Sequence, residues 1–159
     1  MGTGKSAAGR CLAGLLEADF VDLDEAIEKR EVTSITEIFA KKGEEYFREA
    51  EYRMLRDVSS RGGRIVALGG GAVCSGRNRR ILEEEGSVVL LTADRKEIWR
   101  RVGAGTGRPL LQGEGGYGRM VRLLESRERD YSRFGRSVDT TGRTAEETAA
   151  QIVAALERE

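Results

Sequence analysis

The sequence contains no histidine, one proline and two cysteines among its 159 residues. Without histidine, a Ser-His-Asp triad, an imidazole general base and a histidine-ligated metal are all excluded. Cys11 and Cys74 alone cannot build a structural zinc site or the disulfide framework of a small secreted protein. We therefore expect two reduced thiols, and any chemistry must use carboxylates, hydroxyls and cationic side chains.

Charge and hydropathy narrow the class of protein further. Basic and acidic side chains number 27 each, so the formal net charge is zero, whereas a general nucleic-acid binder usually carries a basic excess. No apolar run is long enough to span a bilayer, and the N-terminal residues lack the apolar stretch of a signal peptide. These patterns predict a cytoplasmic protein with no nucleic-acid or membrane partner. Because no leftover apolar face stands out, we expect a monomer.

Helical and strand-like segments alternate along the chain. Apolar spacing predicts helices over 5–17, 25–30, 34–42, 44–60, 78–85, 94–102 and 145–158, and short strands over 20–24, 64–68, 87–92 and 137–140. This alternation indicates an α/β fold, in which helices cover both faces of a mainly parallel sheet. The length fits a single domain over residues 1–159.

Residues 103–118 differ from the rest of the chain. They contain seven glycines and the only proline, Pro109. Such a backbone buries little area and moves readily, as in an exposed loop or in a lid that closes over a ligand. Arg108, near the centre of the segment, favours the lid.

A glycine-rich turn opens the first predicted helix. Gly2-Thr3-Gly4-Lys5-Ser6 matches the second half of the P-loop pattern. In that pattern backbone N–H groups surround a phosphate, the lysine reaches the outer phosphates and the serine can ligate Mg²⁺. The same residues are also compatible with an ordinary helix start. The first glycine of the pattern and the strand before it would precede Met1, so we expect the chain to be N-terminally short, with the first strand of the sheet missing.

Two acids, Asp22 and Asp24, stand near the end of the predicted strand 20–24. Ligands of open α/β sheets gather at that edge, and on an extended backbone both side chains face the same side. One acid could hold Mg²⁺ through water while the other hydrogen-bonds a hydroxyl group. Alternatively, Asp22 and Glu25 form a capping box for the next helix, although this explains only one of the two acids.

Several other candidates have a purely structural interpretation beside the functional one. Arg48 could pair with Glu44 on an exposed helix face, and Arg127, one turn before Tyr131, could lie on a solvated face. The triple glycine 69–71 could be a simple strand-to-helix turn, or it could bring bare N–H groups close to a ligand. None of these features supports a function by itself.

Taken together, and in order over the whole chain, these segments resemble shikimate kinase. The resemblance rests on Met-Gly-Thr-Gly-Lys-Ser (1–6), Asp-Leu-Asp-Glu-Ala-Ile-Glu (22–28), Ile-Phe-Ala-Lys-Lys-Gly-Glu-Glu-Tyr-Phe-Arg (38–48), Gly-Gly-Gly-Ala-Val (69–73), Gly-Arg-Pro-Leu-Leu (107–111) and Arg-x-x-x-Tyr (127–131). Many NTPases share the first segment, whereas the combination of the others is far more specific. The resemblance implies a three-layer α/β/α P-loop kinase fold, a lid over 103–118 and a substrate-binding helical region over 24–60.

The resemblance also implies an activity, namely ATP-dependent phosphorylation of the 3-hydroxyl of shikimate, a step towards chorismate and the aromatic amino acids. Catalytic roles would fall to Asp24, Lys5 and Arg108. The acceptor would contact Asp24, Arg48, Gly69, Gly70, Gly71 and Arg127. ATP would contact Gly2, Thr3, Gly4, Lys5, Ser6, Ala7, Arg101, Arg108 and Arg143, and Mg²⁺ would be held by Ser6 and Asp22.

Two alternatives remain at this stage. Another small-molecule P-loop kinase, such as gluconate kinase, would also need Arg48 and Arg127 for a carboxylate, because the planar guanidinium suits that group. The triple glycine and the Phe47-Arg48 pair favour shikimate over gluconate. A non-catalytic nucleotide-binding module is the second alternative, and the presence of Asp24, Lys5 and Arg108 together argues against it.

Overall fold

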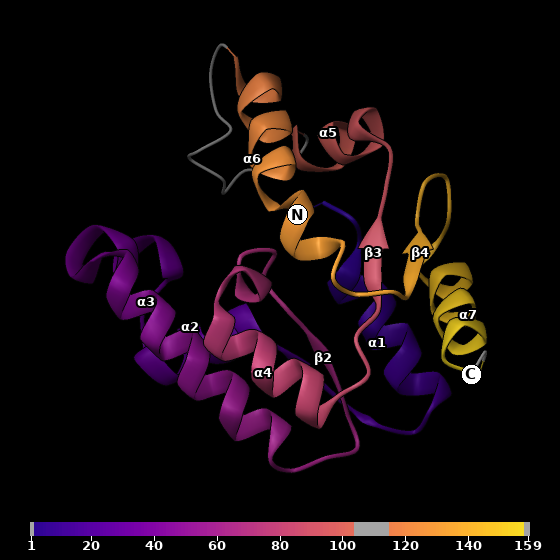
Figure 1. Ribbon diagram of the computed structural model, residues 1–159, viewed down its shortest axis with the longest axis horizontal. Helices are drawn as coiled ribbons and strands as arrows, with labels where there is room; N and C mark the ends of the chain where they lie inside the picture. The colour runs from indigo at the N-terminus through magenta and orange to yellow at the C-terminus, as the bar shows by residue number, and fades with distance from the viewer. Residues whose placement is uncertain (1, 104–114, 158–159) are drawn as a thin grey trace. The chain divides into compact units, whose positions relative to one another are not determined.

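The computed structural model describes residues 2–103 and 115–157, which form helices and short parallel strands of the α/β class (Figure 1). The chain divides into two compact units. Residues 9–88 form the first, called here the middle unit, and residues 1–8 and 89–159 form the terminal unit. Helix α1 (Lys5–Leu15) begins in the terminal unit and continues into the middle unit.

The middle unit is built on two parallel strands. Strands β1 (Asp19–Asp22) and β2 (Arg64–Ala67) pair with Phe20 opposite Ile65. The other elements are helices α2 (Leu23–Glu31), α3 (Ile35–Ser59) and α4 (Gly76–Glu85) and the 3-10 turn η1 (Ala72–Cys74). A Cβ atom at Gly9 would lie 2.5 Å from the Phe20 ring, so only glycine permits this close approach of α1 to β1.

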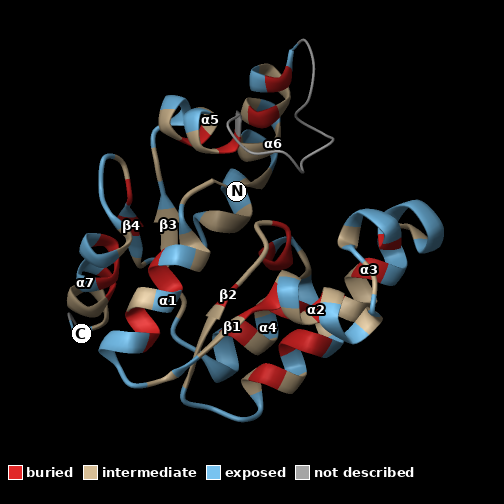
Figure 2. Ribbon diagram, turned by 180° about the vertical axis from the view of Figure 1, so that it is seen from behind, coloured by how far each residue is buried: buried red, intermediate tan, exposed pale blue. Residues whose placement is uncertain are grey.

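The core of the middle unit lies between these helices and the strands. Helix α2 packs against α3, and α3 packs against α4. Parts of these helices are buried, as the red segments of Figure 2 mark. The buried apolar residues include Leu23, Ile27, Leu55, Val58 and Leu82. This packing fixes helices α2 and α3, which carry Asp24 and Arg48.

Helix α3 is interrupted at Gly43, where φ is 83° and ψ is 174°. The prediction of two helices that meet at this glycine is therefore confirmed. Glu31, at the end of α2, accepts hydrogen bonds from Lys42 Nζ at 3.0 Å and Tyr46 Oη at 2.6 Å, one on each side of the break. These bonds brace the break, which sets the direction of the following stretch with Phe47 and Arg48.

The terminal unit also contains one parallel strand pair. Strands β3 (Leu90–Thr92) and β4 (Ser137–Asp139) pair with Leu91 opposite Val138. The helices are α5 (Arg95–Gly103), α6 (Gly116–Tyr131) and α7 (Ala145–Leu156). Ile98, Val102 and Met120 join α5 to α6 in a buried cluster, against which Trp99 packs.

The predicted elements are present with small differences at their ends. The strand predicted over 20–24 ends at Asp22, and the strand predicted over 87–92 begins at Leu90. The described strands form two separate two-stranded parallel sheets. Residues 104–114, most of the predicted lid, lie outside the described residues, and helix α6 begins at Gly116, within the predicted lid. None of the described helices has the length and apolar character needed to cross a membrane.

Val32 ends α2 in the left-handed conformation, with φ at 53°, and the residue is 89% exposed. A β-branched residue is strained there and gains little from burial, so Val32→Gly is expected to raise the free energy of unfolding by about 1 kcal/mol. Urea denaturation measures the change. Lys29→Gly, inside the same helix, is the control and should lower the free energy by about 1 kcal/mol. A Val32→Gly variant no more stable than the parent would contradict the expectation.

Candidate functional site

Asp22 and Asp24 lie at the junction of β1 and α2. Asp22 is the N-cap of α2, and its Oδ1 accepts hydrogen bonds from the backbone N–H groups of Asp24 at 3.1 Å and Glu25 at 3.4 Å. Asp22 therefore caps α2, as the capping alternative predicted, while the Glu25 carboxylate of the predicted capping box accepts from Arg10 Nη2 at 2.9 and 3.0 Å. The prediction that both acids extend from one strand is wrong, because the cap turns the chain into a helix at Leu23. Asp24 therefore stands in the first helical turn.

Gly69, the first residue of the triple glycine, packs directly against Asp24. Strand β2 ends at Ala67, and the chain then passes through residues 69–71 into η1. A Cβ atom built on Gly69 would lie 2.9 Å from Asp24 Oδ1 and 3.4 Å from Oδ2. The absence of a side chain at Gly69 thus allows the carboxylate to rest against bare backbone. The structure brings together two features that are 45 residues apart in the sequence.

Arg48 lies on α3 between two glutamates. Its Nε and Nη2 donate to Glu44 Oε1 at 3.3 and 3.2 Å, as the helix-face interpretation predicted. Its Nη1 donates to Glu51 Oε2 at 3.0 Å, and the guanidinium carbon lies 5.2 Å from the centre of the Phe47 ring. Because the Glu51 side chain is 1% exposed and that of Arg48 is 32% exposed, the guanidinium is anchored from inside and still reaches solvent.

Glu51 is a buried carboxylate that the sequence analysis missed. Burial raises the pKa of this carboxyl, and the nearby Asp24 charge adds to the increase. The Arg48 guanidinium and a hydrogen bond from Asn78 oppose it by favouring the charged form. Arg48 in turn has a raised pKa: burial favours its neutral form, but the charge and hydrogen bond of Glu51 outweigh that effect. The pair holds Arg48 in place within the middle unit, which also contains Asp24 and the triple glycine.

The glycine-rich turn of the terminal unit leads into α1, which begins at Lys5. Gly2 and Gly4 have φ angles of 71° and 80°, which favour glycine, and they flank Thr3. A Cβ atom on Gly2 would lie 2.7 Å from Val102 Cγ1, so the turn is packed tightly against α5. Amide groups at a helix start after such a turn are suited to an anion. Lys5 is half-buried, and its ammonium group makes no hydrogen bond or ion pair within the described part of the chain.

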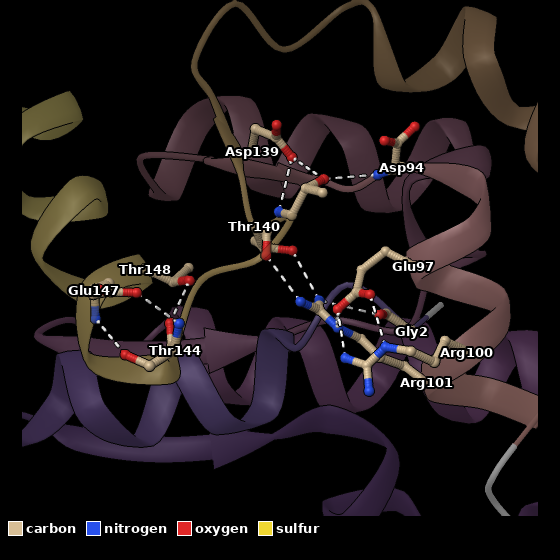
Figure 3. A network of polar contacts seen from close by, with 11 residues as sticks. Gly2, Asp94, Glu97, Arg100, Arg101, Asp139, Thr140, Thr144, Glu147 and Thr148 are labelled. Atoms are coloured by element: carbon tan, nitrogen blue, oxygen red, sulfur yellow. Dashed lines mark hydrogen bonds and ion pairs between the residues drawn. The ribbon is translucent and has the colours of Figure 1, made fainter.

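Arg101, on α5, is held by four oxygen contacts in the network of Figure 3. Its Nε donates to Glu97 at 2.8 Å, Nη1 to the Thr140 hydroxyl at 3.0 Å, and Nη2 to the Thr140 carbonyl at 2.8 Å. Nη1 also reaches the Gly2 carbonyl at 3.5 Å. The hydrogen bond from Arg100, and to a smaller extent Arg101, lowers the pKa of Glu97 to about 2. The guanidinium edge is thus occupied by protein oxygens.

The remaining predicted cations, Arg127, Arg143 and Arg108, have few contacts with the described residues or lie outside them. Arg127 lies half-buried on α6, and its guanidinium has no hydrogen bond or ion pair with the described residues. Arg143 is exposed in the loop before α7, and its Nη1 donates to the Asp139 carbonyl at 2.8 Å. Arg108 lies outside the described residues. Lys5, Arg101, Arg127 and Arg143 all belong to the terminal unit.

The two predicted magnesium ligands suit that ion chemically. A serine hydroxyl and a carboxylate are oxygen donors, which Mg²⁺ prefers, and such sites usually complete their coordination with water and substrate phosphates. Ser6 belongs to the terminal unit and Asp22 to the middle unit. Within residues 2–103 and 115–157, no group of three or more Cys, Asp or Glu residues is arranged to hold a metal ion.

Sequence reasoning missed the side chains that hold the predicted ligands in place. Glu51 follows Arg48 by one helical turn, a spacing that could have indicated the ion pair. Glu97 precedes Arg101 by one turn in the same way. Thr140 bonds Arg101, and Asn78 bonds Glu51, across long sequence separations, so no local pattern indicates these two contacts.

Comparison with known proteins gives one consistent family. The family model described as shikimate kinase matches residues 1–157. A shikimate kinase from Geobacter metallireducens is 43% identical over 157 residues, covering 99% of this chain and 88% of that protein. One from Thermodesulfovibrio yellowstonii is 39% identical, covering 99% and 91%.

Solved structures give the same result at the level of the fold. The structure of shikimate kinase from Acinetobacter baumannii in complex with shikimate matches with a TM-score of 0.92 and 33% identity, covering 100% of this chain and 91% of that one. Shikimate kinase from Aquifex aeolicus matches with a TM-score of 0.82 and 31% identity, covering 99% and 91%. The predicted P-loop kinase fold is confirmed.

Proposed function

Because the chain belongs to the shikimate kinase family, we propose that it transfers the γ-phosphoryl group of ATP to the 3-hydroxyl of shikimate. The products are shikimate 3-phosphate and ADP. The observation that supports this function best is the arrangement in the middle unit, where Asp24 rests against Gly69 and Arg48 is anchored on buried Glu51. An acid for a hydroxyl and a fixed guanidinium for a carboxylate suit an acceptor that carries both groups.

The acceptor side of the mechanism uses these residues directly. Arg48 and Arg127 bind the shikimate carboxylate, while backbone N–H groups of residues 69–71 approach the ring. Asp24 hydrogen-bonds the 3-hydroxyl and accepts its proton as the hydroxyl oxygen attacks the γ-phosphorus. The bond from that phosphorus to the β–γ bridging oxygen breaks, and ADP leaves. Positioning dominates such a transfer, because the transition state needs little covalent assistance.

The nucleotide side uses the terminal unit. The amides of residues 2–7 and the ammonium group of Lys5 bind the phosphates, and Arg108 adds a further cation from the predicted lid. Arg101 presents the face of its guanidinium to the adenine because its edge already bonds Glu97 and Thr140. Arg143 lies in the loop expected to border the base. Mg²⁺, held through Ser6 and Asp22, would supply positive charge to the phosphate oxygens.

The co-substrate, the cellular location and the oligomeric state follow from the same proposal. ATP is the co-substrate, and we expect a cytoplasmic monomer whose Cys11 and Cys74 are thiols, as they are in the structure. Sedimentation at several protein concentrations measures the oligomeric state.

A coupled ADP-release assay tests the function. Purified chain is mixed with ATP and Mg²⁺ and with shikimate, gluconate or no acceptor. We expect rapid ADP release only with shikimate. Release with gluconate would indicate a different small-molecule kinase. Shikimate-independent release, or none with either acceptor, would contradict the proposed activity.

Gly69→Ala is expected to lower kcat by about 100-fold with little loss of stability. The new Cβ would stand 2.9 Å from Asp24 Oδ1. The aspartate side chain can rotate away without moving the backbone, but it then leaves the reacting hydroxyl. Gly76→Ala is a matched control, because its Cβ would meet nothing nearer than Arg79 Nη2 at 3.6 Å. Thermal melts and initial rates of both variants test this, and a Gly69→Ala enzyme with the parent kcat would contradict it.

A further inference from the structure

Asn78 is the only asparagine in the chain, and it is completely buried. It lies on α4, which packs against α3 (Figure 1). Helix α4 also packs against the η1 turn. Neither the P-loop pattern nor the acceptor residues described above include it. Asn78 thus lies between helix α3, which carries Arg48, and the η1 turn, which follows the triple glycine.

The amide nitrogen of Asn78 bonds two acceptors from different elements. Nδ2 donates to the Ala72 carbonyl of η1 at 3.0 Å and to Glu51 Oε2 of α3 at 3.3 Å. The amide oxygen, Oδ1, is buried and has no hydrogen-bond partner within the described residues. The opposite orientation of the amide would place Oδ1 against two acceptors, so the two bonds from Nδ2 fix the orientation.

A side chain that served only for packing would not leave a buried oxygen without a hydrogen bond. An unpaired buried acceptor is costly, and a leucine of similar size would fill the space without that cost. An amide differs from leucine in having two N–H donors. Both donors bind groups that lie next to the residues proposed to bind shikimate. Glu51 Oε2 is the same atom that accepts from Arg48 Nη1 at 3.0 Å. Ala72 N in turn donates to the Gly69 carbonyl at 3.0 Å, which ties η1 to the glycine beside Asp24.

We propose that Asn78 is a positioning residue for the acceptor site: its amide links the Arg48–Glu51 pair to the turn after the triple glycine. Asn78 does not touch the acceptor. It sets the place of the carboxylate-binding guanidinium relative to Gly69 and Asp24, all within the middle unit. This inference rests on the proposed function, since it concerns binding of shikimate.

Asn78→Leu tests the proposal. Loss of a hydrogen bond to a charged group should raise both the KM and the calorimetric Kd for shikimate about tenfold. The KM for ATP should stay unchanged, because the nucleotide residues belong to the terminal unit. Leu82→Ala, on the same helix and also buried, is the control. It should weaken folding while leaving the shikimate Kd at the parent value.

A double-mutant cycle separates positioning from general destabilisation. If Asn78 acts through Glu51, then Asn78→Leu adds little to the shikimate Kd once Glu51→Gln is present. Full additivity, or an unchanged Kd in Asn78→Leu, would overturn the proposal. If Asn78→Leu folds poorly, Asn78→Ser, which retains one donor, replaces it in the same cycle. The shikimate Kd is then measured below the melting temperature of this variant, and the same coupling to Glu51→Gln is expected. Failure of the parent enzyme to use shikimate would instead contradict the proposed function.

Discussion

Replacing Asp24 with asparagine is expected to lower kcat by about three orders of magnitude. The amide keeps the size of the side chain but cannot accept the proton of the 3-hydroxyl. No histidine exists in the chain to replace it, and Asp22 Oδ1 accepts the N-cap hydrogen bonds of α2. Because the amide can still hydrogen-bond the acceptor, the KM for shikimate should change far less than kcat.

Steady-state kinetics with each substrate varied in turn measure this effect. Asp57→Asn provides a matched control, because Asp57 is an aspartate of the same unit that pairs with Arg30 on the surface. Its kcat should equal that of the parent. An Asp24→Asn enzyme that retains more than about a tenth of the parent kcat would remove Asp24 from the role of base.

Replacing Arg48 with alanine should have the second largest effect, with two separable consequences. Loss of the guanidinium that binds the acceptor carboxylate should raise the KM for shikimate about 100-fold. The variant should also lose about 3 kcal/mol of folding free energy, because it leaves the Glu51 carboxylate buried without its cation. The KM for ATP should not change.

Two further variants distinguish these consequences. Arg53→Ala removes an exposed arginine from the same helix, whose partner is Glu49, and should change stability by less than about 1 kcal/mol with no effect on KM. Arg48→Ala combined with Glu51→Gln should recover stability, since no unpaired charge remains buried, yet keep the high KM. Recovery of the parent KM in that double variant would contradict the assignment of Arg48 to the carboxylate.

Local sequence patterns predicted much of the fold. Glycine at 43 predicted the break between two helical stretches, and the structure has a non-helical residue there. The sequence indicated the two acids near the end of the first strand as a pair, but it did not predict their geometry. The apolar pattern extended the strand to residue 24, whereas Asp22 caps α2 and the strand ends there. Asp24 thus reaches Gly69 from a helix.

The supporting contacts could not be predicted because burial decides them. On the helix, Arg48 has acidic neighbours four residues before and three residues after it, at Glu44 and Glu51. Helical spacing treats both as exposed partners. Only the packing of α3 against α4 makes Glu51 a buried anchor and leaves Glu44 at the surface. The same holds for Asn78, whose partners come from α3 and η1.

The position of the phosphate in the product is the most direct test of phosphoryl transfer to the 3-hydroxyl of shikimate. The chain is incubated with ATP, Mg²⁺ and shikimate, and the phosphorylated product is identified by phosphorus–proton correlation NMR. Coupling of the phosphorus to the proton on carbon 3, in an amount equal to the ADP formed, is the expected result. Phosphate on another hydroxyl, or ADP formed with inorganic phosphate as the only other product, would contradict it.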